Sequence, residues 1–213
     1  MIKILIADDH TMMREGLKQI LSGYSDIQIA GEAANGLETL SKIRQLELDI
    51  LLLDLDMPGR SGTELIKQIK DEKPKLPILV LSMHKEEVYA GRVLRAGASG
   101  YLCKDGAPSQ LIHAIRKLYG GGVFITQAAA ENMALGQIPN RNVLPHTLLS
   151  DREFQVFKLI AQGRGITEIA DRLNISVKTI STHKTRLMQK MQMESTADLV
   201  RYALNNELLD SYD

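Results

Sequence analysis

The stretch ILLLDLDMPG at residues 50–59 places four apolar residues directly before two aspartates, and it decides how the first half of the chain folds. A short continuous apolar run is typical of a strand that is buried on both faces of a sheet. Four further strand candidates occupy residues 4–7, 28–30, 78–81 and 100–103, and an amphipathic segment follows each strand candidate. The pattern predicts five βα repeats that form a doubly wound, five-stranded parallel sheet.

The composition of the chain is that of an ordinary globular protein. Its 213 residues are 44% hydrophobic and 24% charged, and no apolar run approaches the ~20 residues that cross a bilayer. Acidic residues at positions 8–9 come too early for a signal peptide. The single cysteine, Cys103, excludes an internal disulfide and any multi-cysteine metal site. We therefore expect a cytoplasmic protein with no membrane partner.

The pattern of the chain changes twice, which predicts two domains and a linker. Residues 1–120 carry the βα repeats and end in a triple glycine. Residues 121–145 contain two prolines and are expected to form a linker, with room for one helix over residues 127–135. Residues 146–213 show only helical periodicity and predict an all-α domain of four helices. Ser150 and Glu153 form a predicted capping box at the start of the first of these helices.

The charges of the chain balance overall but are unevenly placed. Lys and Arg number 26, and so do Asp and Glu, so there is no general attraction to nucleic acid. Residues 172–193, in contrast, carry five basic side chains and no acidic one. A short helix over residues 166–173, a tight turn and a helix over residues 177–191 fit a helix–turn–helix unit. We expect the second helix to lie in the DNA major groove.

The outward positions of this predicted recognition helix are basic or hydroxylic. We expect contacts to DNA phosphates and bases from Lys178, Thr179, Ser181, Thr182, Lys184, Thr185, Arg186 and Lys190. Leu173, Ile175, Ile180 and Leu187 would bury the helix against its neighbours. A small helical bundle that binds protein, with a merely solvated basic face, is the alternative.

The carboxyl ends of four predicted strands carry side chains that suit phosphate chemistry. Asp8 and Asp9 follow the first strand, Asp54 and Asp56 the third, Ser82 the fourth and Lys104 the fifth. Parallel strands of such a sheet end on one edge, so we expect these residues to converge. The clustered carboxylates need a cation, and oxygen ligands without His or Cys favour magnesium.

The remaining groups at this edge suggest a covalent step. A lysine and a hydroxyl beside a metal ion form a cradle for phosphoryl oxygens, a role open to Lys104 and Ser82. Asp54 lies centrally in the predicted sheet and can attack phosphorus, which would give an aspartyl-phosphate. We expect His84 to be a loop residue that tunes access to the phosphate. His10 and His113 are expected to be structural or solvated.

On these residues, the first domain resembles the receiver domain of bacterial two-component response regulators, with its flavodoxin/CheY-like fold. The resemblance implies that Asp54 accepts phosphate from a phosphohistidine of a sensor histidine kinase. It also implies metal and phosphate roles: Asp9 and Asp54 bind Mg²⁺ directly, Asp8 through water and Asp56 through its backbone carbonyl, while Ser82 and Lys104 bind the phosphoryl group. Tyr101 would be the aromatic switch, moving inward behind Ser82 after phosphorylation.

The second domain resembles the LuxR/NarL/FixJ-type output domain. The agreement lies in residues 149–153, 159–163, 168–170, 173–176 and 178–183. Gly165-Ile166-Thr167 departs from the usual Ser-Asn-Lys of the family, and Ser181 replaces a common lysine. Together the resemblances imply a phosphorylation-controlled transcription factor that binds double-stranded DNA and forms a homodimer when phosphorylated.

Two other functions and one surface stay open at this point. A phosphatase of the haloacid dehalogenase type also places Asp-x-Asp after a strand, but Pro58 stands where Thr or Val is expected, and Asp8-Asp9 is unexplained. A protein-binding adaptor is disfavoured by the acid-free basic helix. Finally, the apolar stripe Leu199, Val200, Ala203 and Leu204 on the fourth helix would either pair two output domains or belong to the core.

Overall fold

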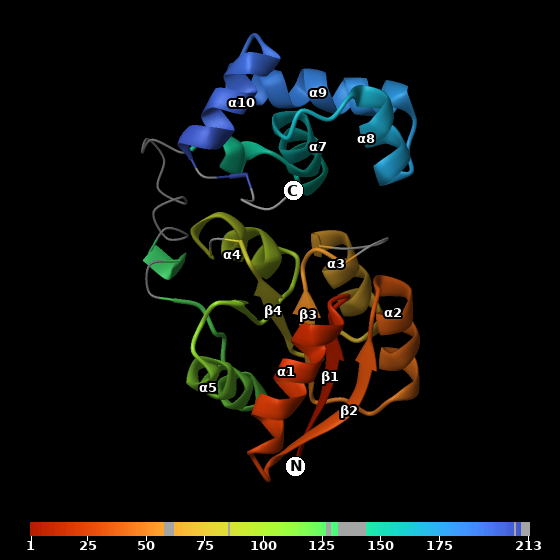
Figure 1. The fold of residues 1–213 in the computed structure, drawn as a ribbon, viewed down its shortest axis with the longest axis vertical. Coiled ribbons are helices and arrows are strands. Elements are labelled where there is room, and N and C mark those ends of the chain that lie inside the picture. Colours follow the sequence, from red (N-terminus) through yellow and green to blue (C-terminus); the bar gives the residue numbers. More distant parts are fainter. Residues whose placement is uncertain (58–61, 85, 127–128, 132–143, 207, 210–213) are drawn as a thin grey trace. The chain divides into compact units, whose positions relative to one another are not determined.

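The structure is a computed structural model of the chain. It describes residues 1–57, 62–84, 86–126, 129–131, 144–206 and 208–209. The chain divides into two compact units, residues 1–134 and 135–213 (Figure 1). Within the described residues, no helix has the length and apolar character required to span a membrane.

The first unit contains a five-stranded, all-parallel sheet, as predicted. The strands are β1 (Ile2–Ala7), β2 (Ile27–Ala33), β3 (Ile50–Asp54), β4 (Ile78–Ser82) and β5 (Gly100–Cys103). Their order is β2-β1-β3-β4-β5, so β3 lies at the centre with Asp54 as its last residue. Every residue of β3 is buried, which explains why its sequence is an uninterrupted apolar run rather than an alternation.

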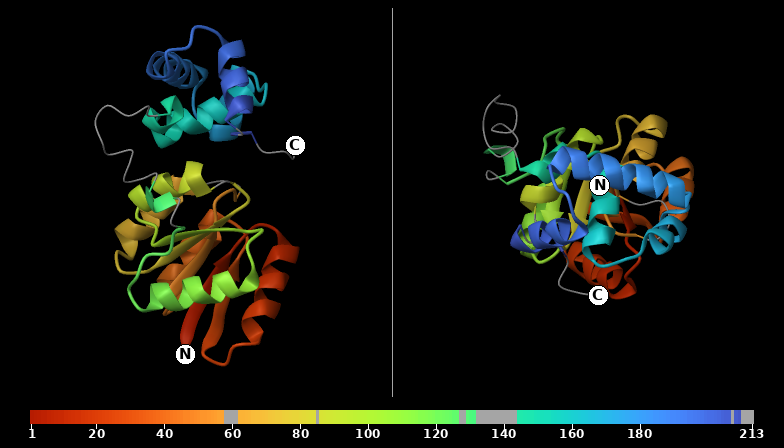
Figure 2. Two further views of the ribbon diagram at one scale, coloured as in Figure 1. Left: turned by 90° about the vertical axis from the view of Figure 1, so that its left-hand side faces the viewer. Right: turned by 90° about the horizontal axis from the view of Figure 1, so that it is seen from above.

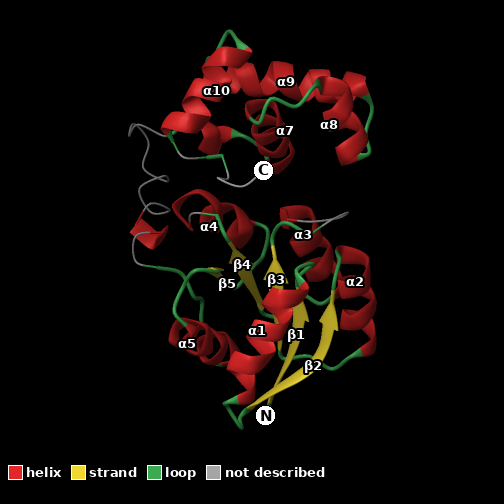
Figure 3. Cartoon of the chain, in the orientation of Figure 1, coloured by secondary structure: helices red, strands yellow, loops and turns green. Residues whose placement is uncertain are grey.

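Helices cover both faces of the sheet (Figures 2 and 3). They are α1 (Thr11–Ser22), α2 (Gly36–Gln45), α3 (Gly62–Glu72), α4 (Glu86–Arg95) and α5 (Pro108–Tyr119). Successive strand residues point to opposite faces, so Leu51 and Leu53 join a core with α2, α3 and α4. Ile50 and Leu52 instead join a core with α1 and α5. The polar residues at the strand ends are left at the carboxyl edge.

The chain returns to the sheet after α5 and covers the outer edge of β5. The Tyr101 amide donates to the Phe124 carbonyl at 2.9 Å, and the Phe124 amide donates to the Ser99 carbonyl at 3.0 Å. The Thr126 amide then donates to Glu86 Oε1 at the start of α4, at 2.7 Å. Of the helix expected over residues 127–135, residues 129–131 are helical, and the other positions lie outside the described residues.

The second unit is all-helical, as predicted. A short 3-10 helix, η1 (Pro145–Leu148), precedes α7 (Asp151–Ala161), α8 (Ile166–Leu173), α9 (Val177–Met191) and α10 (Thr196–Asn205). The predicted capping box at α7 is present: the Glu153 amide donates to Ser150 Oγ, and the Ser150 amide donates to Glu153 Oε2. Asn174 adopts φ +52° between α8 and α9, a left-handed conformation that asparagine tolerates well.

The cover over β5 depends on the missing side chain of Gly100. A Cβ atom there would lie 2.8 Å from the Phe124 carbonyl oxygen, closer than a methyl group can approach. We predict that Gly100→Ala opens the bridge and speeds hydrogen exchange at the Tyr101 and Phe124 amides, because each loses a backbone hydrogen bond. The free energy of such hydrogen bonds corresponds to an increase of about tenfold in the exchange rate.

Gly16→Ala is the matched control, since a Cβ at Gly16 in α1 meets nothing within 4 Å. It should leave exchange at both amides unchanged and stabilise α1 by roughly 0.5–1 kcal/mol. Unaltered exchange in Gly100→Ala would show that the edge pairing does not depend on this glycine.

Candidate functional site

The structure brings three of the predicted acidic residues together at the carboxyl edge of the sheet. Asp8 and Asp54 are buried, at 1% and 2% exposure, and the Asp9 side chain is partly exposed. One donor atom from each of these residues, together with one from His10, lies within 4.8 Å of the others. The strand order explains this, since β1 and β3 are neighbours.

Lys104 supplies the positive charge that makes this burial tolerable. Its Nζ atom lies 2.7 Å from Asp8 Oδ2 and 3.0 Å from Asp54 Oδ1, and its side chain is only 5% exposed. The Lys104 amide donates to the Ser82 carbonyl at 2.8 Å, which fixes where the side chain starts. Burial lowers the pKa of Lys104, but attraction to Asp54 and Asp8 outweighs it and raises the pKa overall.

The Asp54 carboxylate remains incompletely satisfied. Burial raises the pKa of Asp54 to about 6, and the nearby Lys104 ammonium only partly offsets this. Its Oδ2 atom is buried and has no hydrogen-bond partner among the described residues. A buried carboxylate oxygen among other carboxylates fits a hard divalent cation such as Mg²⁺, which prefers oxygen ligands.

Ser82 and Tyr101 are both fully buried beside this cluster. Ser82 Oγ accepts from the His84 amide at 3.1 Å, and the Tyr101 hydroxyl donates to the His84 carbonyl at 2.7 Å. The sequence-based expectation was an inward movement of Tyr101 after phosphorylation. Tyr101 lies in the interior in this structure, held by burial and by this hydrogen bond. Its movement after phosphorylation stays a prediction.

His84 and Asp56 form a contact that the sequence analysis missed. The His84 ring is buried, its Nε2 lies 2.8 Å from Asp56 Oδ2, and it stacks on Tyr89 with 4.4 Å between ring centroids. The Asp56 carboxylate thus faces His84, which agrees with a metal role for its backbone carbonyl alone. The signal was positional: His84 and Asp56 each lie two residues after a strand-end site residue.

His10 is a second residue that was underestimated. Its ring is 68% exposed, but Nδ1 lies 2.9 Å from Asp9 Oδ1 and 3.2 Å from Asp8 Oδ1. The backbone amide of His10 also donates to Asp8 Oδ1, at 2.8 Å. His10 therefore belongs to the edge of the site, and its position directly after the acidic pair was the available signal.

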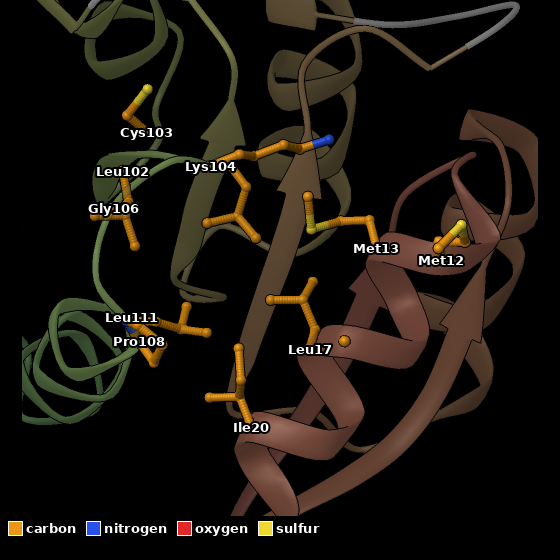
Figure 4. A pocket seen from close by; sticks show the side chains of 12 residues that line it. Met12, Met13, Leu17, Ile20, Leu102, Cys103, Lys104, Gly106, Pro108 and Leu111 are labelled. Carbon is orange, nitrogen blue, oxygen red and sulfur yellow. The ribbon is translucent and has the colours of Figure 1, made fainter.

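An apolar pocket of about 280 Å³ lies between α1 and the segment that contains β5 and the start of α5 (Figure 4). Met13, Leu17 and Ile20 of α1 line one side of it, and Pro108 and Leu111 of α5 line the other. Lys104 also lines the pocket. This side chain therefore separates an apolar hollow from the carboxylates that it pairs with.

The α9 face in the second unit is arranged largely as predicted. Ile180 and Leu187 are completely buried, whereas Leu173 and Ile175 are only half-buried. Lys184 is half-buried. Seven of the predicted DNA-contacting side chains are exposed: Lys178, Thr179, Ser181, Thr182, Thr185, Arg186 and Lys190.

Several of these side chains already have partners on the protein. The hydroxyls of Ser181, Thr182 and Thr185 donate to carbonyls one turn back in α9, so their free lone pairs are left to accept. Lys190 Nζ lies 2.7 Å from Oε2 of Glu153, the buried capping residue of α7. The charge of Lys190 is therefore partly neutralised inside the domain, unlike that of Lys178 or Arg186.

The apolar stripe on α10 belongs mainly to the core. Leu199 and Ala203 are completely buried, Val200 is half-buried, and only Leu204 is largely exposed, at 59%. Of the two possibilities left open by the sequence, the core therefore accounts for Leu199 and Ala203. Only Leu204 and part of Val200 remain for contact with another copy.

Comparison with known proteins gives matches in both units. Residues 4–116 match the response regulator receiver domain, and residues 147–203 match bacterial regulatory proteins of the luxR family. The oxygen regulatory protein NreC of Staphylococcus carnosus (strain TM300) is 40% identical, over 98% of this chain and 100% of that protein. NreC of Staphylococcus aureus (strain JH9) is 39% identical over the same shares.

Solved structures of RcsB resemble the whole chain. RcsB from Salmonella enterica serovar Typhimurium, bound to promoter rprA in the presence of phosphomimetic BeF3-, has a TM-score of 0.73 and 29% identity. The match covers 94% of this chain and 97% of the RcsB chain. A structure of two RcsB dimers bound to two parallel DNAs has a TM-score of 0.60 and 32% identity, covering 95% and 98%.

The raised pKa of Asp54 predicts a cost to the folded, metal-free protein. A carboxyl group whose pKa is higher in the folded state favours folding at low pH, and this contribution is lost as pH rises from about 4 to about 6. At pH 7, Asp54→Asn should therefore raise the unfolding free energy by on the order of 1–3 kcal/mol. Urea unfolding in EDTA measures this, and the gain should shrink towards pH 4.

Asp105→Asn is the control, because Asp105 is an exposed carboxylate in the loop that follows Lys104. It should change the unfolding free energy by less than about 0.5 kcal/mol at either pH. A destabilised Asp54→Asn variant at pH 7 would mean that Lys104 more than compensates the burial of Asp54.

Proposed function

The chain belongs to the response regulators that join a receiver domain to a LuxR-type output domain, and on this premise we propose how it is switched. It is a transcription regulator rather than a metabolic enzyme. We propose that Asp54 accepts a phosphoryl group from a sensor histidine kinase in the cytoplasm. The phosphorylated protein then dimerises and binds promoter DNA through α9. The buried, partly unpaired Asp54 carboxylate beside Lys104 carries the proposal.

Phosphoryl transfer to Asp54 replaces one bond by another. An Asp54 carboxylate oxygen forms a P–O bond while the P–N bond to the kinase histidine breaks, and the imidazole nitrogen keeps the electron pair. Oδ1 of Asp54 already faces Lys104, whereas Oδ2 has no partner among the described residues. Asp54 has two carboxylate oxygens, so one can attack phosphorus while the other would bind the cation.

The surrounding residues would hold the cation and the phosphoryl oxygens. Asp9, Asp54 and the backbone carbonyl of Asp56 would bind Mg²⁺, with Asp8 acting through a water molecule. The ion supplies positive charge opposite the phosphoryl oxygens. Lys104 exchanges its contact with the Asp54 carboxylate for one with a phosphoryl oxygen, and Ser82 donates its hydroxyl to another.

The signal leaves the site through His84 and Tyr101. If Ser82 turns towards the phosphoryl group, its oxygen no longer accepts from the His84 amide, a bond of 3.1 Å here. The His84 carbonyl in turn accepts from the Tyr101 hydroxyl, and the Tyr101 amide donates to Phe124 beyond α5. Movement of the segment after β4 would therefore shift β5 and the start of the linker.

The output domain would bind duplex DNA through the exposed face of α9. Lys178, Lys184 and Arg186 provide charge for phosphates or guanine edges, and the hydroxyl oxygens provide acceptors. One output domain reads one half-site, whereas a two-fold dimer reads two half-sites in register. The phosphomimetic and dimeric DNA complexes of RcsB support this arrangement for a protein of the same organisation.

We predict that Asp54→Asn abolishes phosphate uptake from acetyl phosphate with Mg²⁺ present, because the amide oxygen is a poor nucleophile. Asp9→Ala should lose nearly as much, since Asp54 would then repel the incoming phosphate without its metal. Uptake is followed with labelled acetyl phosphate. If Asp54→Asn takes up label at the wild-type rate, the nucleophile is another residue.

We also predict that neutralising Lys178, Lys184 and Arg186 together flattens the salt dependence of DNA binding. Each lost phosphate contact removes up to about one unit from the slope of log K against log salt, so the triple Gln variant should lose up to about three. Binding of a labelled duplex at several salt concentrations measures the slope.

A triple variant of exposed lysines in the first unit, Lys73, Lys75 and Lys117, makes the same change in net charge. It should keep the wild-type slope. Equal slopes in all three proteins would exclude α9 as the DNA-contacting helix.

A further inference from the structure

An arginine of α1 holds the turn that carries Asp8 and Asp9. Arg14 lies in the first turn of α1, and its side chain is only 14% exposed. Its Nη1 atom donates to the backbone carbonyl of Asp8 at 2.7 Å. Its Nε atom donates to Glu32 Oε2 at 3.2 Å, which ties the turn to β2.

The other polar atoms of Asp8 are fixed as well. The Asp8 amide donates to the Ala33 carbonyl at 3.0 Å, Oδ1 accepts from the His10 amide, and Oδ2 pairs with Lys104. The carbonyl oxygen is the last of these groups, and Arg14 binds it. Asp9, the next residue, points its carboxylate into the cluster from a turn whose backbone therefore has little freedom.

We propose that Arg14 is a positioning residue for metal binding: it clamps the Asp8–Asp9 turn to β2 and thereby sets the affinity of the pocket for a divalent cation. The inference rests on the proposed metal role of Asp8 and Asp9. A planar guanidinium can reach the Asp8 carbonyl and Glu32 at once because its donors form a rigid fork. Groups that orient metal ligands in this way commonly change metal affinity by tenfold or more when removed.

Charge alone makes the opposite prediction. Removing a positive charge from beside the acidic cluster leaves the pocket more negative, which would tighten Mg²⁺ binding. Lys18 separates the two effects: its Nζ also pairs with Glu32, at 2.8 Å, but it makes no described bond to Asp8. Lys18 Nζ pairs with Glu15 as well, at 2.6 Å. Lys18→Gln thus removes a positive charge from beside Glu32, as Arg14→Gln does, and leaves the clamp in place.

The test measures Mg²⁺ binding to the full, metal-free chain by calorimetry, without a phosphate donor. Arg14→Lys keeps the charge but lacks the fork, and we expect it and Arg14→Gln to raise the dissociation constant for Mg²⁺ by about tenfold. Lys18→Gln should stay within about twofold of the wild type. Far-UV circular dichroism confirms that each variant is folded, and Arg14→Lys is the variant least disturbing to α1.

A second readout separates positioning from a general loss of structure. The rate of phosphate uptake from acetyl phosphate is measured against Mg²⁺ concentration. For Arg14→Lys, the Mg²⁺ concentration at half-maximal rate should rise about tenfold, while the rate at saturating Mg²⁺ stays close to that of the wild type. A merely structural role would lower the rate at saturation instead.

Three results would overturn the inference. Wild-type Mg²⁺ affinity in Arg14→Lys would mean that Arg14 contributes only its positive charge. An equal loss of Mg²⁺ affinity in Lys18→Gln would mean that the effect arises from the pairing of Glu32. A lowered saturating rate with unchanged Mg²⁺ affinity would make the role structural. Failure of the proposed metal site gives a different result. In that case the wild-type chain would show either no Mg²⁺ binding or Mg²⁺ binding that Asp54→Asn leaves unchanged.

Discussion

The first unit depends on one electrostatic arrangement: the Lys104 ammonium sits between the buried carboxylates of Asp8 and Asp54. Two carboxylates and a lysine removed from water would be costly without each other, so their positions are coupled. The compensation is incomplete, since burial still raises the pKa of Asp54 to about 6. In the proposed mechanism, this remaining imbalance would make the site responsive to a cation and to a phosphoryl group, both of which change its net charge.

In the proposed mechanism, hydrogen bonds of the sheet would carry a change in that local charge to other parts of the first unit. Lys104 directly follows β5. In β5, the Tyr101 hydroxyl donates to the His84 carbonyl, and the Tyr101 amide donates to the Phe124 carbonyl. Three hydrogen bonds therefore connect Ser82, through His84 and Tyr101, with Phe124 in the predicted linker. In the output domain, the charge that remains available on α9 is smaller than its composition suggests, because Lys190 is paired with Glu153.

Sequence periodicity was enough to predict the strands and their parallel arrangement. The meeting of the acidic residues then followed, because the carboxyl ends of parallel strands lie at the same edge of a sheet. Partnerships between side chains of different elements were not predictable in the same way. The Arg14–Glu32 and His84–Asp56 pairs, the use of Lys190 by α7 and the burial of Leu199 each depend on rotamers and helix packing. A one-dimensional pattern does not contain that information.

We propose that phosphorylation of Asp54 controls assembly of the protein on DNA. Sedimentation velocity of the full chain with a fluorescent duplex, chosen from genomic fragments that the protein itself captures, tests it in one measurement. After treatment with acetyl phosphate and Mg²⁺, the protein should sediment as a dimer, and the duplex should move with it at lower protein concentrations than before treatment. A phosphorylated chain that remains monomeric and binds the duplex no better than the untreated chain would contradict the account.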